Sequence, residues 1–194
     1  LSFGIFRYRT KLIMKLFFSV LLLSLSVAAF SQVKWTTQSG TISFEASVPL
    51  FEEITAENNF VECTINTKNK TISCIVKIKD FNFKLDLMKT HFNEIYLESD
   101  KYPRALFKGS IPNLDIDKIS NEGTILKING TIKIHGVSKP LSVNGIFKKS
   151  KNQLQLQANF ILDTDDFEIK IPSMIIAKVS KKVQTQLDCI LESH

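Results

Sequence analysis

Residues 153–162 read QLQLQANFIL, and apolar and polar side chains alternate along nearly the whole stretch. Successive side chains of an extended segment point to opposite faces, so this order gives the segment one apolar and one polar face. The apolar face carries Leu154, Leu156, Ala158, Phe160 and Leu162. The period of two predicts a β-strand that buries one face.

The same alternation recurs in seven other stretches, which are residues 42–48, 61–65, 72–78, 105–111, 125–134, 141–147 and 183–191. Turn-forming residues separate several of them: Lys68-Asn69, Asn121-Glu122-Gly123, His135-Gly136 and Lys151-Asn152. Strands that are apolar on one face must close or stack to bury it. The pattern therefore predicts an all-β fold, an antiparallel barrel of about eight strands, whose interior is just wide enough for side chains or one slim ligand.

One stretch departs from this period. Between residues 83 and 99 the apolar side chains recur mostly at spacings of three and four, which predicts a short helical insert over about 84–99. Tyr102-Pro103 ends it, because a residue before proline avoids helical angles. Pro172 opens a second irregular piece and predicts a helical turn near 172–177.

The N-terminal residues have the composition of a secretory signal peptide. Lys15 precedes a run from Leu16 to Phe30 that is almost wholly apolar, and small residues follow it. The run is shorter than the ~20 residues of a membrane span. We expect translation to start at Met14, cleavage to remove residues 1–31, and the exported domain to be 32–194, with no membrane span left after cleavage.

Removing the predicted signal peptide brings the net charge of the chain close to zero. Residues 1–31 carry four basic and no acidic side chains, so the net charge falls from +6 to +2. So weak a basic balance gives no reason to expect nucleic acid as a partner. The residues that remain suit a single domain with a real core.

Three cysteines remain: Cys63, Cys74 and Cys189. A hairpin turn at Lys68-Asn69 would place Cys63 opposite Cys74, where a cross-strand disulfide would form if the pair were oxidised. We favour buried free thiols, which pack as small hydrophobes, because all three fall on the apolar faces of their strands.

No catalytic, metal-binding or cofactor motif stands out. The sequence has no nucleotide-binding loop and no Gly-x-Ser-x-Gly nucleophile elbow. His91 and Glu94 are too few ligands for zinc, which takes three or four from the protein. His135 is expected to bond within its own turn, and the acidic residues 163–168 lack the spacing of a calcium loop and are interpreted as solvated. We therefore predict no catalytic residue, no metal and no cofactor, apart from a bound lipid or isoprenoid.

Apolar bulk is the main feature that remains, since the chain holds 15 phenylalanines. These side chains either fill the barrel or line a cavity that the insert holds open. The candidate lipid-binding residues are Phe44, Phe83, Leu87, Met88, Phe92, Phe107, Phe147, Phe160 and Met174.

Two phrases carry a family resemblance: residues 91–109, HFNEIYLESDKYPRALFKG, and residues 130–141, GTIKIHGVSKPL. Together with Ile42-Ser43-Phe44, residues 54–58, Phe81-Asn82-Phe83, Leu87-Met88 and residues 169–173, they resemble the short, single-domain branch of the YceI-like family. The resemblance implies a lipocalin-like, extended eight-stranded barrel with a helical insert. It also implies a periplasmic or secreted location, a polyisoprenoid or other long-chain amphiphile as ligand, and in some members a homodimer.

The chain departs from the family at one place. Many members carry an Arg-x-Asp-Phe-Gly-like phrase near the last strands, and here Thr164-Asp165-Asp166-Phe167-Glu168 lacks the Arg and the Gly. We predict an exported, non-enzymatic protein that sequesters or carries a long-chain lipid. The alternatives are a structural barrel with a filled core and a protein partner, or an envelope enzyme, which would need an ionisable pair on the inward face.

Overall fold

The structure, a computed structural model, describes residues 34–193. The predicted signal peptide, 1–31, and the predicted start at Met14 lie outside the described residues. The strands are β1 (Lys34–Glu45), β2 (Thr55–Asn66), β3 (Thr71–Lys77), β4 (Asn82–Phe83), β5 (Arg104–Ser110), β6 (Thr124–Ile134), β7 (Val137–Ser150), β8 (Gln153–Asp163) and β9 (Lys182–Ser193).

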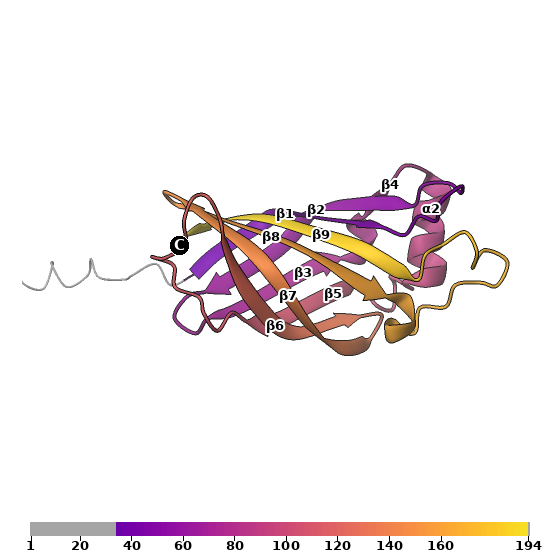
Figure 1. The fold of residues 1–194 in the computed structure, drawn as a ribbon. Coiled ribbons are helices and arrows are strands. Elements are labelled where there is room, and N and C mark those ends of the chain that lie inside the picture. The colour runs from indigo at the N-terminus through magenta and orange to yellow at the C-terminus, as the bar shows by residue number, and fades with distance from the viewer. Residues whose placement is uncertain (1–33, 194) are drawn as a thin grey trace, which may run out of the picture. The chain divides into compact units, whose positions relative to one another are not determined.

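Eight of these strands close into a barrel. The order is β1-β9-β8-β7-β6-β5-β3-β2, and a further pairing of β1 with β2 completes the ring. Neighbouring strands are antiparallel throughout, and the two-residue β4 adds to one end of β2. The predicted all-β, eight-stranded antiparallel barrel is confirmed (Figure 1). Closure removes the open sheet edges that would otherwise remain unpaired.

Short turns fix the register of the hairpins. His135 and Gly136, both with positive φ, join Ile134 to its partner Val137, as a two-residue hairpin turn requires. Lys151-Asn152 joins β7 to β8 in the same way. The turn between β2 and β3 is longer than predicted, because four residues, 67–70, lie between Asn66 and its partner Thr71. It is centred on Lys68-Asn69, so the predicted register is unchanged.

That register places Cys63 directly opposite Cys74, with 4.2 Å between their Cα atoms, and the two form a disulfide. The interpretation of this pair as free thiols was therefore wrong. Their direct opposition on the inward face brings the sulfurs together, and burial alone does not distinguish thiol from disulfide. Cys189 is a buried free cysteine, as predicted. In β1, Gly40 makes room for it, because a Cβ at that position would lie 2.6 Å from the Cys189 sulfur.

The insert between β3 and β5 contains two helical elements. Helix α2 (Asp86–His91) continues into a π-helical turn, η3 (Phe92–Tyr96), as the spacing of apolar residues predicted. The predicted helical turn near 172–177 is instead a pair of successive turns. The Ile175 N–H donates to the Pro172 carbonyl and the Lys178 N–H donates to the Ile175 carbonyl, and the chain then enters β9 without forming a helix.

The barrel interior is not uniform along its axis. At the end away from the insert, large side chains pack into a filled core that includes Trp35, Ile65, Phe147, Leu154 and Leu191. At the insert end, many inward side chains such as Ile42, Phe44, Leu162 and Leu187 are only partly buried. The two interpretations of the sequence, a filled barrel and an open cavity, therefore apply to different ends of one barrel.

Candidate functional site

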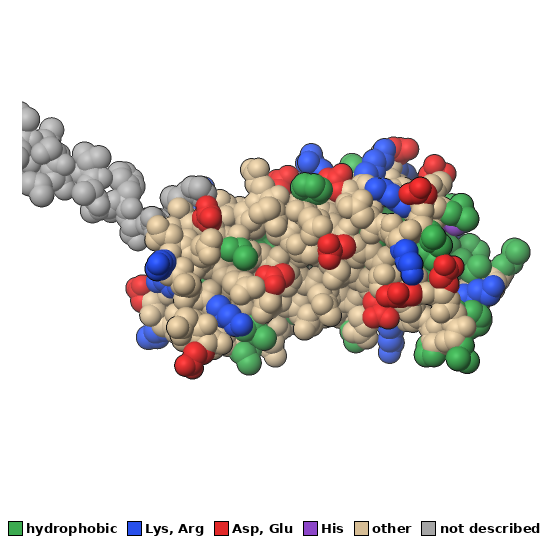
Figure 2. Space-filling view, turned by 90° about the horizontal axis from the view of Figure 1, so that it is seen from above, with side chains coloured by type: hydrophobic (Ala, Val, Ile, Leu, Met, Phe, Trp, Pro, Cys, Tyr) green, Lys and Arg blue, Asp and Glu red, His purple; other side chains and the backbone are tan. Residues whose placement is uncertain are grey.

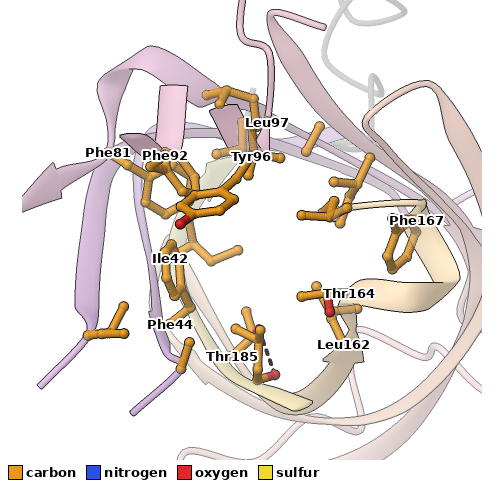
Figure 3. Close-up of a pocket in the computed structure, with 18 of the residues that line it drawn as sticks. Ile42, Phe44, Phe81, Phe92, Tyr96, Leu97, Leu162, Thr164, Phe167 and Thr185 are labelled. Atoms are coloured by element: carbon orange, nitrogen blue, oxygen red, sulfur yellow. Dashed lines mark hydrogen bonds between the residues drawn. The ribbon is translucent and has the colours of Figure 1, made fainter. Parts of the chain in front are cut away.

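A cavity of about 580 Å³ occupies the insert end of the barrel. Its size falls in the roughly 300–1,000 Å³ range of small-molecule sites in proteins. Strands from around the barrel, the insert and the two loops 46–54 and 168–181 all contribute to its walls. Figure 3 shows the lining side chains pointing toward a common empty space, and nearly all of them are hydrocarbon.

Four phenylalanine rings build one wall of this cavity. Phe92, from the insert, lies 5.5 Å from Phe44 in β1 and 5.0 Å from Phe83 in β4, measured between ring centroids. Phe81 completes the cluster, 5.4 Å from Phe44 and 5.5 Å from Phe92. Edge and offset contacts at these distances stabilise aromatic pairs beyond their burial. The cluster therefore packs the insert against the rim of the barrel and forms one wall of the space beneath it.

The structure brings most of the predicted site residues together. Seven of the nine line the cavity, namely Phe44, Phe83, Leu87, Met88, Phe92, Phe107 and Phe160. Phe147 points inward as predicted but is fully buried in the filled end. Met174 lies on the loop before β9, where its side chain is 89% exposed outside the cavity lining. Alternation places a side chain on a face, and it does not say how far along the barrel axis the filled core extends.

Several lining residues were missed. Tyr96 and Leu97 belong to the insert, whose apolar spacing was recognised without assigning a side. Phe167 lies in η4 (Thr164–Phe167), within the acidic stretch interpreted as solvated, and is nevertheless buried. The signal for Phe167 was its aromatic ring among carboxylates, since a large apolar residue in a polar turn usually packs inward.

Few polar groups face the cavity. Tyr96 lines the cavity with its hydroxyl beside Ile42 (Figure 3), and burial raises the pKa of that phenol above its usual range, so the hydroxyl stays neutral. Thr164 presents a buried Oγ1 that has no hydrogen-bond partner among the described residues. The ionisable side chains in the lining include Glu52, His91 and Asp163, and no hydrogen bond or ion pair joins one to another within residues 34–193. The arrangement suits a mostly apolar ligand that carries a weakly polar, uncharged group.

His135 ties the insert to the barrel rim. Its Nε2 lies 2.8 Å from a carboxylate oxygen of Glu98, and its Nδ1 lies 3.1 Å from the Phe167 carbonyl oxygen. Each ring nitrogen thus faces one acceptor, a carboxylate oxygen on one side and a backbone carbonyl oxygen on the other. Tyr102 packs edge-on against the ring with centroids 4.6 Å apart. The prediction that His135 bonds within its own turn was wrong, because its partners come from two other segments.

The described part of the chain contains no cluster of three or more His, Cys, Asp or Glu side chains arranged to hold a metal ion. Within residues 34–193, no helix is long and apolar enough to span a bilayer.

Comparison with known proteins gives a consistent match. The family model described as "YceI-like domain" matches residues 29–191. A polyisoprenoid-binding domain from Saccharophagus degradans, implicated in plant cell wall breakdown, superimposes with a TM-score of 0.73 at 13% identity, covering 84% of this chain and 99% of that one. Burkholderia cenocepacia BcnA gives a TM-score of 0.64 at 11% identity, covering 78% and 95%. Campylobacter jejuni YceI protein gives 0.59 at 14% identity, covering 76% and 88%. At such identities these structures show a shared fold. No curated protein sequence matches the chain.

Proposed function

Since the chain belongs to the YceI-like family, we propose that it is an exported binding protein that holds a long-chain lipid, such as a polyisoprenoid, in the cavity at the insert end. The observation that carries this proposal is the cavity itself. It is large, apolar and open only where the barrel is not filled. A polyisoprenoid-binding domain is among the structural neighbours, which supports the same class of ligand.

Burial of hydrocarbon supplies the affinity. Each methylene removed from water contributes ~0.8 kcal/mol, so a segment of about ten contributes roughly 8 kcal/mol before losses. Ordering the chain and losing its free motion offset part of this, and since about 8 kcal/mol net corresponds to micromolar affinity, such an affinity requires a buried segment longer than about ten methylenes. The cavity supports such a ligand because hydrocarbon side chains, including Phe44, Phe92 and Phe107, cover its walls.

We expect a polar end of the ligand to pair with one of the neutral hydroxyls of the lining, such as that of Thr164 or that of Tyr96. The Thr164 Oγ1 lacks a partner, and the Tyr96 hydroxyl remains protonated. An alcohol, amide or carbonyl oxygen would pair with them at little cost in desolvation, whereas a carboxylate or phosphate would bring an unpaired charge into an apolar space. We therefore expect a lipid whose buried portion is uncharged.

Export is part of the proposal. The apolar run at 16–30 with its preceding lysine supports a signal peptide, and a periplasmic or secreted location is common among proteins of this family. The Cys63–Cys74 disulfide favours the same location, because disulfides persist in oxidising compartments.

An enzymatic role lacks a comparable observation. An envelope enzyme needs a positioned acid, base or nucleophile, and among the described residues no hydrogen bond or ion pair joins one ionisable side chain of the lining to another. A filled barrel that works only through a protein partner would leave a cavity of this size unexplained.

A pair of matched double variants tests the proposal. Leu162→Trp with Val143→Trp adds bulk to the cavity, because both side chains line it from neighbouring strands. Ile161→Trp with Ile146→Trp makes the same changes on the same strands but on the outer face, where both isoleucines are exposed. Binding of a long-chain isoprenol is measured by titration and native mass spectrometry. We expect the inward variant to bind at least about tenfold more weakly and the outward variant to bind like the wild type.

The free energy of unfolding of both variants, measured in urea, serves as the control for folding. Equal isoprenol affinity in the two variants, with both folded, would overturn the assignment of the cavity as the lipid site.

A further inference from the structure

The cavity opens at an end of the barrel that carries unusually many exposed apolar side chains. Leu50, Leu87 and Met174 are 103%, 65% and 89% exposed, and Phe51, Leu85 and Ile176 are also exposed. We call these six residues the apolar rim. Figure 2 shows hydrophobic side chains gathered at this end of the barrel, whereas the barrel wall shows only scattered ones. Contiguous apolar patches on a soluble domain commonly mark a surface that binds a partner or a membrane.

The apolar rim is continuous with the mouth of the cavity. Phe51, Leu85 and Leu87 are exposed and also belong to the cavity lining, so they mark the place where the cavity meets solvent. The three segments that carry the rim are the β1–β2 loop, the insert, and the loop before β9. The Ser180 N–H donates to the Ala46 carbonyl at 2.8 Å and so joins the first and last of these segments. Two of the three segments are therefore joined directly, and all three border the same cavity.

One exposed rim residue, Leu50, has a strained backbone conformation. The Phe51 N–H donates to the Val48 carbonyl in a four-residue turn with Pro49 second and Leu50 third, where Leu50 has a φ of 72°. Such a turn normally has glycine at its third position, because bulky side chains disfavour a positive φ. A fully exposed leucine in a strained position is unfavourable for stability, and such strain indicates a role for the side chain.

The charges beside the rim are mixed, since Glu52 and Glu53 follow Phe51, but those of residues 169–182, in the loop before β9 and its start, are all basic and indicate the partner. Residues 169–182 contain Lys170, Lys178, Lys181 and Lys182 and no acidic residue, and they flank the exposed tip at Met174 and Ile176. Of these lysines, Lys181 is paired with Asp165 at 2.8 Å, and Lys178 lies 6.0 Å from the centre of the Phe51 ring. Apolar tips flanked by lysine are suited to a bilayer interface, where the tips enter the acyl boundary and the amines meet anionic headgroups.

From this surface we propose that the barrel docks by its apolar rim onto an anionic lipid bilayer, with the cavity mouth facing the membrane. This inference rests on the proposed function and adds the route by which the ligand enters. A chain-like lipid then slides from the bilayer into the cavity without exposing its hydrocarbon to water. The partner is the bilayer surface, and a second copy of this chain or another protein is an outcome that the test separates.

Vesicle sedimentation tests the docking. The probes are vesicles of pure phosphatidylcholine and vesicles with about one third phosphatidylglycerol. We expect the wild type to bind both, to bind the anionic vesicles more strongly, and to lose that difference at high salt. Met174→Ser with Ile176→Ser removes two tips and is expected to weaken binding by at least about tenfold. The matched control, Ile125→Ser with Ile190→Ser, changes two isoleucines of the outer wall that are also exposed and is expected to bind like the wild type.

The variant Leu50→Gly distinguishes a loss of vesicle binding from a loss of stability. Glycine relieves the positive φ, so this variant is expected to unfold at the same or a higher urea concentration than the wild type while binding vesicles several-fold more weakly. All variants share the wild-type N-terminus, so any binding by residues 1–33 is common to them.

Three results would overturn the proposal: no binding of the wild type to either vesicle, equal loss in the rim and wall variants, or a vesicle-free dimer that the rim variant abolishes. Native mass spectrometry of the same samples reports lipid in the cavity separately. Lipid-loaded protein that ignores vesicles therefore contradicts the docking and leaves the binding function standing.

Discussion

Cys189 is a free thiol buried in the filled end of the barrel. Burial, and secondarily the charge of Asp188, raises the pKa of the Cys189 thiol to about 12. The thiolate is the reactive form, so a thiol with so high a pKa is inert at neutral pH. Sequence alternation predicted the burial of Cys189, and it gave no means of recognising that Gly40 on β1 supplies the space.

We predict that a thiol-specific reagent titrates no cysteine in the native protein and one per chain after denaturation without reductant, since Cys63 and Cys74 are joined. Three thiols after denaturation would contradict the disulfide, and one in the native state would contradict the burial of Cys189.

The same thiol predicts a pH dependence. Between its ordinary pKa of 9.0 and about 12 the folded chain keeps the thiol proton, whereas the unfolded chain loses it. The contribution of Cys189 to the free energy of unfolding therefore falls as pH rises through this window, by up to ~1.4 kcal/mol per pH unit. We expect urea unfolding of wild type and Cys189→Ala to diverge in this direction between about pH 8 and 10.5, and a constant difference would contradict it.

Two glycines on the inward face leave room for the Phe107 ring, because neither has a Cβ. Gly109 and Gly130 are cross-strand partners, and a Cβ at Gly130 would lie 2.6 Å from the Phe107 Cζ and would also meet the Lys108 carbonyl. We expect Gly130→Ala to lower the free energy of unfolding by about 1–3 kcal/mol, because the backbone carbonyl has little freedom to move. Thr131→Ala, an exposed neighbour, is the control and should change it by less than about 0.5 kcal/mol in urea unfolding.

At the scale of elements, the strands were predictable and the attachment of the insert was not. Each strand repeats a local period of two, and each hairpin register follows from its turn, as with His135-Gly136. The contacts of His135 with Glu98 and Phe167 span 37 and 32 residues, and no local pattern encodes a partner at that distance. The two sequence phrases that carry the family resemblance meet at this attachment.

Removing the His135 ring should loosen the insert while leaving the barrel closed. Asparagine tolerates the positive φ of this position and cannot reach both acceptors, so His135→Asn isolates the effect of the lost bonds. We expect faster amide hydrogen exchange in residues 92–102 and a cost of about 1–3 kcal/mol in unfolding free energy. His91→Asn is the matched control, since no hydrogen bond of its ring is part of the attachment. Equal exchange in the two variants would show that the insert is held by its aromatic contacts alone.

At the scale of the whole molecule, a barrel filled at one end and open at the other is the feature on which function depends. Period-two alternation identified the inward face, including the lining residues Phe44, Phe107 and Phe160, and it equally selected Phe147, which lies in the filled end. The position of a residue along the axis depends on strand tilt and register around the ring, which alternation within one strand does not contain. Two of the three segments that carry the apolar rim, the loops 46–54 and 168–181, show no regular spacing of apolar residues, so their placement around the cavity mouth, and not their sequence, reveals the surface.

Lipid binding in the cavity is tested by native mass spectrometry of the protein recovered after export, followed by organic extraction and lipid analysis. We predict a stoichiometric adduct that disappears on extraction and matches an uncharged long-chain lipid in the extract. A clean apo mass that stays unchanged after incubation with isoprenols and fatty acids would contradict it.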